Sequence, residues 1–215
     1  RVRWENSRVE FVMQAGGPSG VGGDDDIGNA VRLSVEAWGA PECSVVVPVF
    51  SGFTLAPPAP GDGVNSIGWV LGAWSDLGVA SDAAATTDVQ YEQIGNEWRI
   101  VEADIYLNAQ SQTWTLDPNS TDARYVNAVL VHEIGHALGL LHPCELDDPT
   151  VPFCTEEFDG RAMLPIYSPN QANLAKDDEA GICFLYPGMA CEQFECPDGT
   201  ICTEFGCLET CGEEV

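Results

Sequence analysis

The sequence predicts an α+β domain followed by a short cysteine-rich tail, and three observations support this prediction. Short apolar segments with strand-like patterning recur through the first half of the chain. Three longer segments show helical periodicity instead. Five of the nine cysteines fall after residue 190. We therefore expect two units, a folded domain at 1–187 and a disulfide-stapled tail at 188–215.

The predicted elements follow from local patterns along the chain. In the segment RVEFVMQ, apolar residues alternate with polar ones, which indicates a strand with one buried face. The segment WRIVEADIYLN is joined to the strand before it by a short turn with Gly95, which indicates a hairpin. The five predicted strands are 8–14, 43–50, 65–71, 83–91 and 98–108, and the three predicted helices are 24–39, 120–142 and 174–186.

The acidic triplet Asp24–Asp26 at the start of the first helix has two interpretations. Aspartates at a helix N-terminus cap free amide groups and interact favourably with the helix dipole. A run of carboxylates can also hold calcium. Capping is the more common role, and we expect it here.

Composition excludes several classes of function. A net charge of −26 with only 8 Lys and Arg residues leaves no basic patch for nucleic acid. No apolar run approaches the roughly 20 residues that a membrane-spanning helix needs. The acidic field favours cationic substrates, or it simply keeps the protein soluble. We expect a monomer.

The cysteines indicate an oxidising compartment. A zinc ribbon would require closely spaced C-x2-C pairs, and the tail cysteines are spaced more widely. The opening residues contain no signal-like apolar segment, so the chain is either cytosolic or a processed mature form. The nine cysteines favour the second, and we expect a secreted protein. Cys144 and Cys154 bracket a short acidic loop, and we expect a bridge between them.

All three histidines of the chain fall within the stretch VHEIGHALGLLHP. His132 and His136 are four residues apart, so a helix presents both on one face to one metal ion. Gly139 permits a backbone reversal that brings His142 back as a third ligand. Three nitrogen ligands leave a fourth position open, which is typical of catalytic zinc. Glu133 lies beside the first ligand as the candidate general base.

The segment HEIGHALGLLH resembles the zinc-binding motif of the metzincin metallopeptidases. That clan also has a methionine turn beneath the metal, and RAMLPIY supplies one at Met163. The M-x-P-x-Y spacing is similar to that of matrixins, in which Pro165 and Tyr167 would line the S1′ pocket. The segment LAKDDEAGICFLYP resembles the C-terminal helix of matrixins. Pro143, where matrixins usually have serine, is a departure.

The resemblance implies a fold and an activity. The fold would be a metzincin catalytic domain with a twisted, mixed five-stranded sheet, three main helices and a zinc cleft. The activity would be that of a metalloendopeptidase acting on extended polypeptides, with one catalytic Zn²⁺. Calcium is possible, but no motif assigns its ligands. The alternative is an inactive metzincin scaffold that serves as a binding or adhesion module.

The resemblance also implies roles for further residues. Asp177 would brace the methionine turn, and Asp178 would meet the N-terminal ammonium of a trimmed chain. Ala128 would set the depth of the S1′ pocket, and its small side chain implies a preference for large apolar P1′ residues. A Cys43–Cys183 bridge, similar to one in astacins, would tie the two halves together. The tail is either a stapled cap or a partner-binding module.

Overall fold

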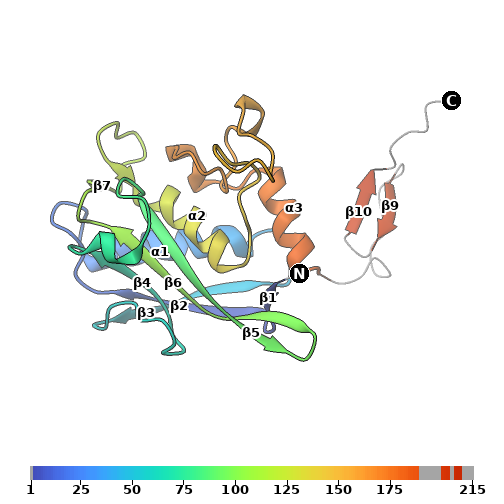
Figure 1. Ribbon diagram of the computed structural model, residues 1–215, viewed down its shortest axis with the longest axis horizontal. Coiled ribbons are helices and arrows are strands. Elements are labelled where there is room, and N and C mark those ends of the chain that lie inside the picture. The colour runs from blue at the N-terminus through green and yellow to red at the C-terminus, as the bar shows by residue number, and fades with distance from the viewer. Residues whose placement is uncertain (1, 189–199, 204–205, 210–215) are drawn as a thin grey trace.

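The computed structural model describes residues 2–188, 200–203 and 206–209, and it contains the predicted mixture of helices and strands (Figure 1). The strands are β1 (Arg3–Trp4), β2 (Arg8–Gln14), β3 (Val47–Thr54), β4 (Asn65–Val70), β5 (Ala85–Ile94), β6 (Glu97–Asn108), β7 (Trp114–Thr115), β8 (Arg124–Tyr125), β9 (Thr200–Thr203) and β10 (Gly206–Glu209). The helices are α1 (Asp24–Gly39), α2 (Val126–Ala137) and α3 (Lys176–Leu185), with 3₁₀ turns η1 (Trp74–Leu77), η2 (Glu156–Phe158) and η3 (Pro169–Ala172).

The main sheet is mixed, as predicted. Its long strands run in the order β3-β2-β4-β6-β5, and the short β1 also pairs with β6. Only β5 is antiparallel to its neighbour. The hairpin between β5 and β6 turns at Gly95, whose φ of 65° is the left-handed conformation that glycine tolerates. β5 therefore forms an edge of the sheet, next to α2 (Figure 1).

Helices α1 and α2 pack against one face of this sheet and against each other. Alternating strand residues and one stripe of each helix meet in a single core. Trp38, at the end of α1, is fully buried and donates its indole N–H to the carbonyl of Val131 in α2. Helix α2 is thus fixed to α1 and to the core of the domain.

The opposite face of the sheet is covered in part by the loop 55–64. Pro58 lies so close to Gly68 of β4 that an added Cβ would meet its ring at 2.3 Å. The backbone amides of Gly61 and Gly63 donate to the carboxylate of Glu102 in β6. Acidic side chains of β6 are therefore buried beneath this loop.

Two predicted elements differ most from the structure in their bounds. The strand expected at 43–50 is β3, which begins only at Val47, because Cys43 is held in a disulfide bond and Ser44 bridges to Pro187. The helix expected at 120–142 is the shorter α2. Its expected first turn instead leads into β8, which pairs with β7. The acidic triplet lies in the first turn of α1, but the N-cap residue is Gly23, and Asp26 accepts a hydrogen bond from the amide of that residue.

Both disulfide bonds predicted within residues 1–187 are present. Cys43 is bonded to Cys183 and Cys144 to Cys154. The bridges predicted within the tail lie outside the described residues.

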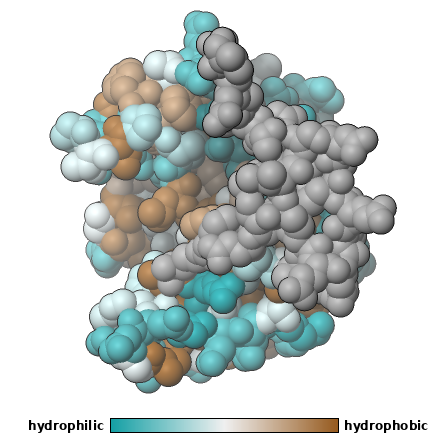
Figure 2. Space-filling model, turned by 90° about the vertical axis from the view of Figure 1, so that its right-hand side faces the viewer, coloured by the Kyte–Doolittle hydropathy of each residue, from teal (hydrophilic) through white to brown (hydrophobic). Residues whose placement is uncertain are grey.

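Among the described helices, none is both long and apolar enough to span a membrane. Figure 2 shows hydrophobic residues gathered on part of one face, with hydrophilic residues above and below them.

Candidate metal centre and active-site cleft

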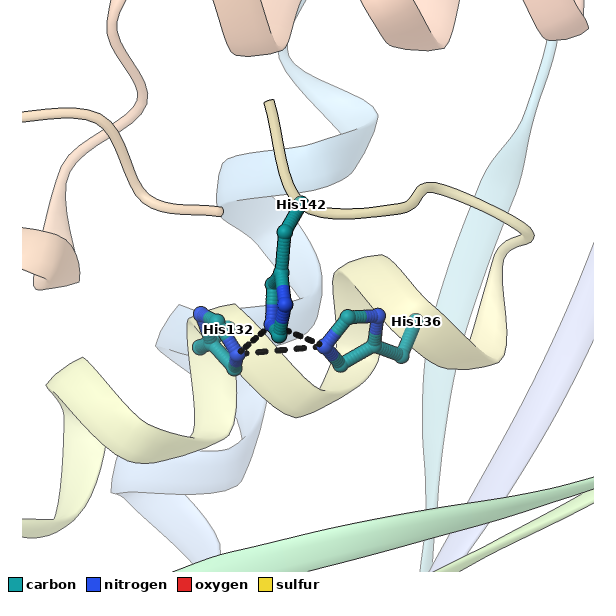
Figure 3. A group of neighbouring side chains, drawn as sticks. All are labelled: His132, His136 and His142. Carbon is teal, nitrogen blue, oxygen red and sulfur yellow. Dashed lines mark hydrogen bonds between the residues drawn. The ribbon is translucent and has the colours of Figure 1, made fainter. Parts of the chain in front are cut away.

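The three histidines converge on one point, as the sequence predicts. His132 and His136 project from α2 one turn apart, and His142 reaches the same point from the chain beyond the helix (Figure 3). Their Nε2 atoms lie 3.1, 3.0 and 3.2 Å from one another. Three ligands about 2.0–2.1 Å from one tetrahedral ion would lie about 3.3 Å apart. The triangle of nitrogens therefore fits a single zinc ion.

The outer nitrogen of each ring determines where its proton lies. His132 Nδ1 is 2.8 Å from the carbonyl oxygen of Ala162, and His136 Nδ1 is 2.9 Å from that of Leu140. His142 Nδ1 is 2.6 Å from Oε1 of Glu145. Carbonyl and carboxylate oxygens only accept, so each Nδ1 carries the hydrogen and each Nε2 offers a lone pair. Three lone pairs facing each other repel, and a cation between them removes that repulsion.

Burial favours the neutral rings that a metal requires. Desolvation and the charges of His136 and His142 together lower the pKa of His132 to about 3, although the hydrogen bond to Ala162 acts in the opposite direction. Desolvation also lowers the pKa of His136, and desolvation together with the charge of His136 lowers the pKa of His142. Neutral imidazole is the form that binds metal. Among the described residues, this is the one group of three potential ligands close enough to share an ion.

Gly139 makes the reversal that delivers the third histidine. Its φ is 98°, and an added Cβ would lie 2.8 Å from the carbonyl oxygen of Val2. The helix carbonyls left free at this end have partners from distant parts of the chain. Trp4 donates its indole N–H to the carbonyl of Ala137, and Tyr186 donates its hydroxyl to that of Leu138.

Glu133 lies beside the metal centre in a buried position, with 6% of its surface exposed. Thr87 of β5 donates its hydroxyl to Oε2 of this carboxylate at 2.6 Å. Burial raises the pKa of Glu133 to about 7, while the hydrogen bond from Thr87 and the charge of His142 act in the opposite direction. A carboxylate with a pKa near neutrality is suited to accept and return a proton.

Met163 lies beneath the metal centre, as the resemblance implies. It is buried and packs against α2 at Gly135, where an added Cβ would meet Sδ of Met163 at 2.2 Å. The absence of a side chain at position 135, between the two helical ligands, is what allows this contact. The methionine turn therefore supports the helix directly under the histidines.

The structure corrects one of the two expectations for the aspartates of α3; the other, a contact between Asp178 and the N-terminal ammonium, involves residue 1, which lies outside the described residues. Asp178 is 2% exposed and accepts hydrogen bonds from the amides of Ala162 and Met163 at 2.8 and 3.1 Å. Asp178, and not Asp177, therefore braces the methionine turn. Asp177 points outward and lies 3.4 Å from Arg161. Helix geometry explains the difference, because adjacent residues on a helix face different directions.

The metal centre lies in a cleft of about 720 Å³ bordered by β5, α2, the segment after Gly139 and the segment after Met163. Pro165 and Tyr167, which the resemblance places in the S1′ pocket, border this cleft. Tyr167 also accepts a hydrogen bond from the amide of Tyr125. Ala128 does not border it; this residue is fully buried, because its methyl group ends inside the core. The residue of α2 that does border the cleft near this end is Val129.

The fold and the metal centre define a metzincin, with an edge strand, a ligand helix, a glycine reversal and a methionine turn. The family model for matrixin matches residues 79–187, about half of the chain, and the chain belongs to this family. Matrixins are zinc-dependent metalloendopeptidases, so membership implies this class of activity and the use of zinc. A search of curated proteins finds no match.

Two residues of the site were not predicted from the sequence. Thr87 lies on the edge strand and Glu145 lies three residues beyond the last ligand. Alternation along β5 places Thr87 on the face toward α2, which is a usable signal once the strand is known. The proximity of Glu145 to His142 in the sequence was a signal for a second carboxylate near the metal.

Proposed function

We propose that this protein is a secreted zinc endopeptidase and that Glu133 is its general base. The observation that carries the proposal is the convergence of three unprotonated Nε2 atoms beside a buried carboxylate, all bordering one cleft. His132, His136 and His142 would hold the ion. When bound, zinc supplies a Lewis acid that polarises the scissile carbonyl and makes water a stronger acid.

The residues of the chain carry out the proton transfers. Glu133 accepts a proton from the attacking water and delivers it to the leaving nitrogen. Thr87 fixes the orientation of the carboxylate through its hydrogen bond to Oε2. Glu133 is almost entirely buried, so the proton that its carboxylate accepts is shielded from bulk water.

The substrate would lie extended along β5. Among the described strands, β5 pairs with β6 alone, so its other edge is available for backbone hydrogen bonds with a peptide. Val129, Leu164 and Tyr167 border the cleft and offer apolar surface to one substrate side chain. We propose a preference for large apolar P1′ residues such as Leu or Phe. A cleavage-site profile dominated by small or charged P1′ residues would contradict it.

The remaining parts of the proposal concern organisation. Residues 1–187 form the catalytic domain and 188–215 a separate cysteine-rich tail. The two disulfide bonds of the described catalytic part support export to an oxidising compartment. We propose that the protein acts as a monomer.

The decisive experiment compares the wild type with Glu133→Gln on denatured casein and gelatin. The wild type should cleave both, lose activity with a chelator and regain it with added zinc. Glu133→Gln should keep one zinc per chain by elemental analysis and lose activity by several orders of magnitude, because the amide cannot accept the proton. Glu179→Gln removes an exposed acid of α3 and should behave as the wild type. A wild type that binds zinc without cleaving any substrate would favour the inactive scaffold.

A further inference from the structure

The third zinc ligand differs from the other two in its outer partner. His132 and His136 donate Nδ1–H to backbone carbonyls, whose positions follow from the main chain. His142 donates to the carboxylate of Glu145 at 2.6 Å. A carboxylate partner brings a full negative charge next to the ligand, which makes the imidazole a stronger donor to a metal. It also sits on a flexible side chain, so something must hold it in place.

The loop 144–154 holds Glu145 at its base. The Cys144–Cys154 disulfide closes this loop, and Cys144 is fully buried. Next to the disulfide, the amide of Glu145 donates to the carbonyl of Pro152 at 2.9 Å, and the amide of Cys154 donates to the carbonyl of Glu145 at 3.1 Å. The backbone of Glu145 is thus fixed on both sides by the closed loop.

The rest of the loop is exposed, although Leu146 also borders the cleft, so the disulfide has little core to stabilise there. Its buried members, Cys144 and Cys154, pack with Leu164 and Phe158 in a small cluster separate from the main core. Leu164 follows Met163 and borders the cleft. The disulfide therefore links Glu145, the hydrogen-bond partner of His142, to Leu164 in the wall of the cleft.

We propose that Glu145 is a positioning residue for zinc and that the Cys144–Cys154 disulfide acts on the metal centre through it. Glu145 fixes the tautomer and ring orientation of His142 and supplies charge that partly balances the ion. The disulfide keeps the carboxylate within reach of Nδ1. This inference rests on the proposed zinc site and concerns how tightly that site holds its ion.

The first test measures zinc affinity by competition with a chromophoric chelator, without reference to activity. Removal of an outer-shell partner of this kind typically weakens metal binding about 10- to 100-fold. We expect Glu145→Ala to fall in that range and Glu145→Gln to lose less, since its amide oxygen still accepts from Nδ1. Asp147→Asn removes the same charge two residues away in an exposed position and should change affinity less than about twofold.

The outcomes separate this inference from the proposed function. If Glu145→Ala binds zinc as tightly as Asp147→Asn does, the positioning role is wrong while the zinc site stands. If the wild type itself fails to bind zinc, both proposals are wrong. Cobalt-substituted protein adds a spectroscopic readout that loss of stability alone does not move. Glu145→Gln should shift its visible bands and Asp147→Asn should not; unchanged bands in Glu145→Gln would contradict the inference.

The second test asks whether the disulfide acts through the same residue. Replacing Cys144 and Cys154 together by alanine should weaken zinc binding by about the same factor as Glu145→Ala. Adding Glu145→Ala to that double variant should then have no further effect, because the interaction is already lost. Losses that multiply would show that the disulfide and Glu145 act independently, and the coupled role would be refuted.

Discussion

The sharpest stability prediction concerns Asp104, a carboxyl group buried beneath the loop 55–64. It is 1% exposed, and Oδ1 accepts a hydrogen bond from the amide of Ser66 at 2.9 Å. Oδ2 has no hydrogen-bond partner within the part of the chain that the structure describes. Burial, which is the largest cause, and the charges of Glu102, Asp62 and Asp88 together raise the pKa of Asp104 from 3.8 to about 6, while the hydrogen bond from the Ser66 amide opposes them.

A raised pKa in the folded state means that stability falls as pH rises. Below pH 3.8 both states are protonated, and Asp104 contributes no pH dependence. Between pH 3.8 and about 6 the unfolded state loses its proton first, so unfolding becomes easier. At about 1.4 kcal/mol per pKa unit, the full effect is about 3 kcal/mol. Above about pH 6 both states are ionised and the difference stays constant.

The assay compares the wild type with Asp104→Asn in urea, both as metal-free protein, between pH 4 and pH 8. Asparagine keeps the acceptor for Ser66 and removes the charge. Relative to the wild type, the variant should gain up to about 3 kcal/mol of unfolding free energy as pH rises from 4 to 7. The histidines and Glu133 titrate in both proteins, so their contributions cancel. A difference that stays flat over this range would refute the reasoning.

Two further predictions concern the supports of the metal centre. Gly139→Ala should destabilise the fold and weaken zinc retention, because the new side chain combines a positive φ with a clash against the carbonyl of Val2. The control Gly160→Ala has a positive φ but open space around it, and it should lower the free energy of unfolding by only about 1–2 kcal/mol. Equal losses for the two variants in chemical denaturation would exclude the clash. Asp178→Asn should lower the free energy of unfolding by about 2–4 kcal/mol, since buried amides lose a charged acceptor. Asp177→Asn should lower the free energy of unfolding by less than about 1 kcal/mol. A larger loss for Asp177→Asn than for Asp178→Asn would indicate that Asp177 braces the methionine turn after all.

Local spacing explains which parts of the site could be predicted from the sequence. The positions of His132, His136 and His142 depend on one helical turn and one glycine, and both are readable within a dozen residues. The hairpin at Gly95 and the helix α1 are local for the same reason. The methionine turn was predictable only through resemblance, because nothing local distinguishes Met163 from an ordinary core residue.

The incorrect predictions share a physical cause, which is dependence on distant contacts. Ser120 to Asp122 have the composition of a helix start, but Arg124 and Tyr125 pair with β7, so α2 begins later. Asp177 and Asp178 are neighbours of the same type, and only the packing of α3 decides which one is buried. Ala128 was placed by its distance from His132, whereas the path of the cleft decides that Val129 borders it.

The contacts at the end of α2 have a consequence for the order of assembly. The carbonyls of Ala137 and Leu138 accept hydrogen bonds from Trp4 and Tyr186, which lie near the two ends of residues 1–187. Contacts between such remote segments form late in folding, because closing a long loop costs entropy first. A polypeptide still leaving the ribosome therefore has its histidines but not both of the side chains that cap the end of α2, and this end of the helix is complete only after Tyr186 has been synthesised.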